Sequence, residues 1–87
     1  MSLYKEEQYQ ISYAKHNWSC QVCGNPANQI AHLIPQRKWL IEKYGERVIN
    51  HNDNLLPACS LKCNDKLQLS QWQWEKKAEQ IKKIIEN

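Results

Sequence analysis

The sequence predicts a small α+β domain in which helix content exceeds strand content. Three observations lead to this expectation: periodic apolar residues near both ends, two short apolar runs in the middle, and two closely spaced cysteine pairs. The 87 residues suffice for one domain, and we expect residues 1–87 to form a single unit. A domain of this size buries little more than about 60% of its unfolded surface, so it needs additional stabilisation.

The first predicted element is a helix over residues 3–16. Tyr4 and Ile11 lie seven residues apart, and Tyr9 and Tyr13 lie four apart. These steps place aromatic and aliphatic groups on neighbouring faces of a helix. We expect this helix to flank and pack around the centre of the chain.

The middle of the chain is predicted to contain two short strands. Residues 29–34 form one apolar run, and residues 55–56 form a return strand that Pro57 ends. Between them a helix is expected over about residues 36–44, with Gly45 at its C-terminal end.

Residues 47–52 are predicted to be extended or loop. The last helix is predicted over about residues 64–86, with a bend near Ser70, because apolar residues recur at steps of seven, four, three and four. This stripe consists of Leu67, Trp74, Ala78, Ile81 and Ile85. Trp72 falls nearly opposite Trp74, so it is the better candidate for an interface with DNA or a second subunit.

Charge and hydropathy limit the classes of partner. The net charge is +3, from 12 Lys+Arg and 9 Asp+Glu, which favours polyanions only weakly. No apolar run is long enough to span a membrane, and the first residues do not resemble a signal peptide. We therefore expect no membrane partner and a cytoplasmic location.

The four cysteines form two short pairs, Cys20 with Cys23 and Cys59 with Cys63. Two such pairs separated by a long insert are typical of a four-thiolate zinc site. Gly24 follows the first pair, where a tight turn needs a positive φ. The alternative is two disulfides in a secreted protein, which the absence of a secretion signal disfavours. We expect one structural Zn²⁺ that stabilises the fold and takes no part in chemistry.

The residues between and after these pairs carry a second pattern. "AHLIP" contains His32, "DNLLPAC" contains Asn54, and "CN" is Cys63 followed by Asn64. Together with the cysteine pairs, this ordered set resembles the HNH endonuclease family, also called ββα-metal nucleases, over residues 18–66. The resemblance implies a zinc-stapled ββα finger, in an H-N-N variant, flanked by the two terminal helices.

The resemblance also implies an activity, the metal-dependent hydrolysis of DNA to 5′-phosphate and 3′-hydroxyl ends. His32 matches the general base, Asn54 the residue that orients the site loop, and Asn64 a ligand of a catalytic Mg²⁺ or Mn²⁺. One site cuts one strand, so a monomer is expected to nick and a double-strand break would require a dimer or two encounters. A homodimer is left open, and a bacterial or phage origin is expected.

One position departs from the family pattern. Many members place Asp or His, a metal ligand, immediately before the base, where this chain has Ala31. His51 is the first candidate to replace that ligand, and Asp53 and Asp65 are others. The longer second cysteine pair also moves Asn64 one step further along than is usual.

Alternatives remain for these residues and for the function. Arg37 and Lys66 are candidates for phosphate contact, although both suit a solvated face. His32 is alternatively a buried histidine bonded to the backbone. The rival function is a catalytically inactive, zinc-stabilised nucleic-acid-binding module, in which Ala31 marks a lost site.

Overall fold

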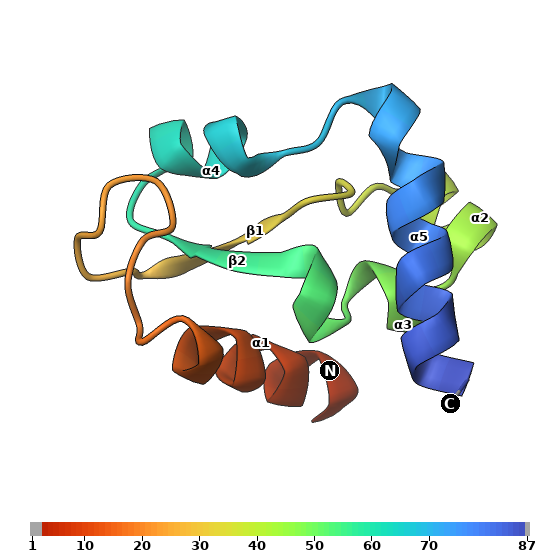
Figure 1. Ribbon diagram of the computed structural model, residues 1–87, viewed down its shortest axis with the longest axis horizontal. Helices are drawn as coiled ribbons and strands as arrows, with labels where there is room; N and C mark the ends of the chain where they lie inside the picture. The colour runs from red at the N-terminus through yellow and green to blue at the C-terminus, as the bar shows by residue number, and fades with distance from the viewer. Residues whose placement is uncertain (1–2, 87) are drawn as a thin grey trace.

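The computed structural model describes residues 3–86. Its elements in chain order are α1 (Leu3–Lys15), β1 (Gln29–His32), α2 (Lys38–Tyr44), α3 (Glu46–Ile49), the 3₁₀ helix η1 (Asn52–Asn54), β2 (Leu55–Ala58), α4 (Leu61–Leu67) and α5 (Gln71–Glu86). The fold is a small α+β one with more helix than strand, which confirms the predicted class (Figure 1). None of the helices in residues 3–86 has both the length and the apolar composition that crossing a membrane requires.

The two strands pair antiparallel at the centre of the molecule. We call this two-stranded unit the hairpin, although α2, α3 and η1 lie between its strands in sequence. His32 pairs with Leu55, and Gln29 pairs with Ala58. The ladder continues as the Leu33 N–H donates to the Asn54 carbonyl at 2.9 Å. In this register, the N–H and C=O groups of alternate residues, His32 among them, point away from the partner strand.

Pro57 lies inside β2, whereas the sequence suggested that it would end the strand. Its register places its backbone nitrogen at the outer edge, so the missing N–H removes no hydrogen bond of the hairpin. Its carbonyl, at the same edge, accepts a hydrogen bond from the Gln21 N–H at 3.0 Å. The proline is therefore tolerated because the sheet has only two strands.

Helices α1 and α4 lie on opposite sides of the hairpin (Figure 1). The Tyr9 ring of α1 meets the His32 ring edge-on, with centroids 6.0 Å apart. On the other side, Asn64 of α4 donates a hydrogen bond from Nδ2 to Gln29 Oε1 at 3.3 Å. Since side chains alternate along a strand, Gln29 and His32 project from opposite faces, as these contacts require.

The main core lies at one end of the hairpin, where α2, α3 and α5 meet. Its buried members are Ile34, Leu40, Tyr44, Val48, Ile49, Trp74, Ala78 and Ile81. The predicted stripe of the last helix therefore supplies three of these residues. Val48 and Ile49 belong to α3, so the expectation of an extended or loop segment over 47–52 was wrong at its start. Adjacent residues of a strand point to opposite faces, whereas in a helical turn Val48 and Ile49 can both enter the core.

The C-terminal helix is divided more sharply than the expected bend. α4 begins at Leu61 and ends at Leu67, and α5 starts at Gln71. Between them the Leu69 N–H donates to the Leu33 carbonyl at 2.9 Å, and the Trp74 indole N–H donates to the Leu69 carbonyl at 3.1 Å. These bonds tie the connecting residues to the end of the hairpin and exclude a continuous helix.

Two other elements are shorter than predicted. The run 29–34 is a strand only as far as His32, and α2 begins at Lys38 rather than near residue 36. A turn in which the Arg37 N–H donates to the Pro35 carbonyl at 3.0 Å separates them.

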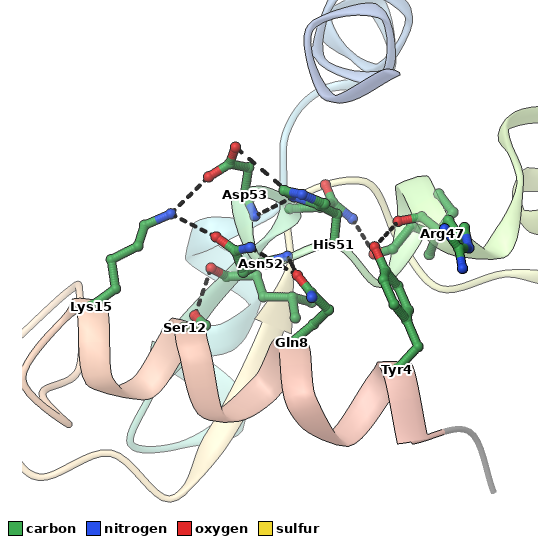
Figure 2. A network of polar contacts seen from close by, with 11 residues as sticks. Tyr4, Gln8, Ser12, Lys15, Arg47, His51, Asn52 and Asp53 are labelled. Atoms are coloured by element: carbon green, nitrogen blue, oxygen red, sulfur yellow. Dashed lines mark hydrogen bonds and ion pairs between the residues drawn. The ribbon is translucent and has the colours of Figure 1, made fainter. Parts of the chain in front are cut away.

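Helix α1 docks through polar side chains, as Figure 2 shows. Gln8 and Ser12 are buried, whereas Ile11 is 39% exposed. The Ser12 hydroxyl donates to the Leu55 carbonyl at the outer edge of β2 (2.9 Å), and Gln8 Oε1 accepts from the Asn52 N–H at 2.8 Å. A strand edge and a 3₁₀ turn offer unpaired backbone groups, so polar residues suit this contact better than the apolar ones that the sequence pattern suggested.

Candidate functional site

The four cysteines meet in one cluster. Their sulfur atoms all lie within 4.8 Å of one another, and none is in a disulfide. The Sγ atoms of Cys23 and Cys59 are 3.3 Å apart, and those of Cys59 and Cys63 are 3.8 Å apart. Four Zn–S bonds of about 2.3 Å in a tetrahedron require sulfur separations of about 3.8 Å. The cluster can therefore hold a structural metal such as zinc.

Each pair is positioned by its own turn. In the first, Gly24 has φ 81° and its N–H donates to the Cys20 carbonyl at 2.9 Å. In the second, Ser60 is the N-cap of α4, and its hydroxyl accepts a hydrogen bond from the Cys63 N–H at 3.2 Å. The additional residue in this pair is the consequence of placing Cys59 before the cap and Cys63 in the first helical turn.

The thiols of this cluster influence one another. The backbone N–H of Cys23 donates to the Cys20 sulfur and lowers the pKa of that thiol to about 6, while a hydrogen bond with the Cys23 side chain raises the pKa of Cys59 to about 12. Crowded thiols cannot all ionise without a compensating charge. A divalent cation supplies that charge and holds its thiol ligands in the deprotonated form.

His32 lies at the end of β1 and is 9% exposed. Its Nε2 is 3.0 Å from Asn50 Oδ1, and because an amide oxygen only accepts, Nε2 is assigned the proton. No residue in 3–86 forms a hydrogen bond to Nδ1, and Nδ1 is not among the fully buried side-chain nitrogens of these residues, so it keeps some contact with solvent. The ring is thus held by one nitrogen and presents the lone pair of the other.

Burial lowers the pKa of His32 below the ordinary value for histidine, and the positive charge of Lys5 acts in the same direction. The hydrogen bond to Asn50 opposes these effects. The imidazole is therefore neutral near pH 7, which is the protonation state that a proton acceptor needs.

Asn54 is fully buried and connects two segments of the chain. Its Oδ1 accepts from the Ile34 N–H at 2.9 Å, and its Nδ2 donates to the Ile34 and Ile49 carbonyls at 3.2 and 2.7 Å. Ile34 follows the strand that carries His32, and Ile49 precedes Asn50. The amide of Asn54 thus fixes the spacing of His32 and Asn50, which are joined by a hydrogen bond. The part of Asn54 in catalysis stays a prediction.

Asn64 and His32 lie on opposite faces of the hairpin, so they do not face one another across a single face. The Asn64 Nδ2 reaches the Ile30 carbonyl at 3.3 Å, besides its bond to Gln29. Ile30, like His32, directs its backbone groups to the outer edge of β1. Residues two apart in a strand are separated by roughly 7 Å, so the carbonyl that Asn64 contacts lies one strand repeat from His32 along that edge, while the His32 ring projects from the other face.

His51 is the N-cap of η1 and not a member of a second metal cluster. Its Nδ1 accepts a hydrogen bond from the Asp53 N–H at 3.1 Å, and the Asp53 carboxylate pairs with Lys15 at 2.7 Å (Figure 2). Within residues 3–86, the four cysteines are the one group of three or more His, Cys, Asp or Glu side chains close enough to bind a metal ion. The ligand role expected for His51 therefore has no supporting cluster, and Asp65 is exposed on α4.

The other residues named from the sequence lie at the surface, and one important residue was missed. Arg37 and Lys66 are exposed, so both are free to meet a ligand. Asn50, which is 2% exposed, was not identified because its bond to His32 spans 18 residues. Its place just after the apolar pair Val48–Ile49 was the only signal that it would be buried.

Comparisons with known proteins identify one short similarity. No protein-family model and no solved structure matches the chain. Over 42 residues it is 38% identical to a mitochondrial DNA mismatch repair protein mutS homolog of Sarcophyton glaucum. The similarity covers 48% of this chain but only 4% of that protein, so it concerns a small part of the larger one.

Proposed function

We propose that the chain is a metal-dependent DNA endonuclease that hydrolyses phosphodiester bonds and leaves 5′-phosphate and 3′-hydroxyl ends. The observation that supports this most strongly is the state of His32, which is neutral, held at Nε2 by Asn50 and open at Nδ1. A base oriented through one nitrogen and free at the other is the arrangement that general-base catalysis by histidine requires.

In this mechanism His32 Nδ1 accepts a proton from the water that attacks phosphorus, the bond from phosphorus to the 3′ oxygen breaks, and that oxygen takes up a proton from solvent to become the 3′-hydroxyl. The side-chain oxygen Oδ1 of Asn50 then stabilises the imidazolium, because it accepts a hydrogen bond from His32 Nε2–H whether or not Nδ1 is protonated. The substrate phosphate lies along the outer edge of β1, where Asn64 contacts the Ile30 carbonyl and His32 is the next residue whose backbone groups face outward. Asn54 holds the two segments that carry His32 and Asn50.

The catalytic metal would be held by Asn64. Both contacts of its amide are made by Nδ2, and its Oδ1 is engaged by no other residue in 3–86, so this oxygen is available as a ligand. Mg²⁺ and Mn²⁺ accept such oxygens, and Mg²⁺ commonly retains several waters beside one or two protein ligands and the substrate phosphate. When bound, the ion supplies charge stabilisation to the phosphate and to the leaving oxygen.

Three further observations support DNA as the substrate. The sequence pattern resembles that of HNH endonucleases, the net charge is +3, and the partial similarity is to a DNA mismatch repair protein. A monomer with one site is expected to nick. Four free thiols suit a reducing compartment, so we include a cytoplasmic location in the proposal.

Nicking of supercoiled plasmid in Mg²⁺ or Mn²⁺ tests the proposal. We expect the zinc-loaded wild type to convert supercoiled to open-circular DNA, and His32→Ala to be about 10²- to 10⁴-fold slower, the usual contribution of a general base. Zinc content and DNA affinity serve as controls and should be unchanged. If wild type and His32→Ala are equally inert with several metals while both bind DNA, the chain is instead a zinc-stabilised binding module.

A further inference from the structure

The surface of α5 contains a groove that the proposed active site does not use. Its volume is about 470 Å³, and it is lined by Leu69, Trp72, Gln73, Lys76, Lys77 and Gln80. Trp72 is 80% exposed, although an indole is among the side chains that gain most from burial. The lining contains two lysines and two glutamines but no carboxylate.

The groove is built on a firmly anchored part of the helix. Trp74, on the opposite side of α5 from Trp72, is buried in the core and donates its indole N–H to the Leu69 carbonyl. The Gln73 side-chain oxygen accepts from the Ser70 N–H at 3.1 Å. Because Trp74 and Gln73 fix the first turn, the backbone that carries Trp72 is held in place, while the Trp72 side chain itself is not covered by the fold.

The groove extends toward the segment that positions His32. α5 packs against η1, and the Lys77 ammonium is close enough to lower the pKa values of both His51 and Asp53. His51 directly follows Asn50, the hydrogen-bond partner of His32. A nucleic acid strand bound at Lys77 therefore lies near η1, which begins two residues after Asn50.

We propose that this groove binds a single-stranded stretch of nucleic acid, with one base stacked on Trp72 and the neighbouring phosphates on Lys76 and Lys77. An indole face accepts any base and a lysine pair accepts the phosphates, the combination that single-strand binding surfaces use. Bases inside a duplex are already stacked on their neighbours and cannot cover Trp72. The inference deepens the proposed function by naming the substrate form that its site receives.

The test is binding of a labelled thymidine oligonucleotide, without added divalent ions, to zinc-loaded protein carrying His32→Ala. We expect single strands to bind more tightly than a duplex of equal length and to quench Trp72 fluorescence. Trp72→Ala should weaken single-strand binding roughly 5- to 150-fold, since stacking contributes about 1–3 kcal/mol per base. Leu61→Ala, which removes an apolar side chain that is 74% exposed outside the groove, is the control and should bind normally.

Two further variants identify what covers Trp72. Trp72→Phe should restore most of the affinity because it keeps an aromatic face, whereas Trp72→Leu should not. If Leu restores binding as well as Phe does, or if Trp72→Ala converts a dimer to a monomer, then a protein surface occupies the groove and the inference is wrong.

The lysines are tested by the dependence of binding on salt. Replacing Lys76 and Lys77 with Gln should lower the slope of log K against log[salt] by about 1.4, or about 0.7 for each phosphate of a single strand that a lysine no longer neutralises. The same changes at Lys38 and Lys82, which are exposed and outside the lining, should leave the slope unchanged. Normal binding by the Trp72 and Lys76/Lys77 variants would overturn the inference, and it would leave plasmid nicking by the wild type, and hence the proposed function, unaffected.

Discussion

Chelating the zinc that the four-cysteine cluster can hold is expected to unfold the domain. The cluster joins the turn before β1 to the beginning of α4, whereas the apolar core lies at the other end of the hairpin. Structural zinc binds with about 10–16 kcal/mol in small domains, which is comparable to the total stability of about 5–15 kcal/mol of most domains. Chelation should therefore abolish most of the helical circular dichroism signal, and added Zn²⁺ should restore it.

A matched pair of substitutions separates the metal from the local helix cap. Cys63→Ser removes a sulfur ligand and should lower zinc content and the melting temperature together. Ser60→Ala, three residues earlier, removes only the hydrogen bond to the Cys63 N–H and should cost about 1 kcal/mol with zinc retained. If metal-free protein melts at the same temperature as the zinc-loaded form, the cluster does not stabilise the fold.

Asn54→Ala is expected to have the second largest effect on stability. The change leaves the Ile34 N–H and the Ile34 and Ile49 carbonyls without their side-chain partner in the protein interior. Each unsatisfied buried group costs about 1–3 kcal/mol, so we expect a loss of about 3–5 kcal/mol in the free energy of unfolding. Urea unfolding of the zinc-loaded protein, monitored by tryptophan fluorescence, measures it.

Asn28→Ala is the control for this change, because Asn28 is exposed and should shift the free energy of unfolding by less than about 0.5 kcal/mol. An effect this small at Asn54 would mean that its amide does not hold together the segments around Ile34 and Ile49, which adjoin His32 and Asn50.

The sequence predicted those features of the fold that depend on short-range patterns. The spacing of the cysteines predicted their cluster, and the stripe through Trp74, Ala78 and Ile81 predicted the buried face of the last helix. The positive φ of Gly24 agrees with the turn expected after the first cysteine pair. The helix face and the turn are local features, and the cluster joins two such turns, each of which has its own short cysteine spacing.

Features that depend on contacts between distant segments could not be predicted in this way. The polar docking of α1 depends on unpaired backbone groups of β2 and η1, some 43 and 44 residues away in sequence. The break at residues 68–70 depends on the Leu33 carbonyl, and the orientation of His32 depends on Asn50. The sequence located the candidate histidine, but the separation of Asn64 from His32 follows from strand alternation and pairing register.

The pH dependence of plasmid nicking tests most directly whether His32 removes a proton from water, on which the proposed mechanism depends. Because burial lowers the pKa of His32, wild-type activity should fall only as the pH drops below the ordinary histidine value of about 6.5. Asn50→Asp places a carboxylate beside Nε2, which favours the imidazolium, so the acid limb should move to higher pH. An acid limb at the same pH in wild type and Asn50→Asp would contradict the role of His32 as the base.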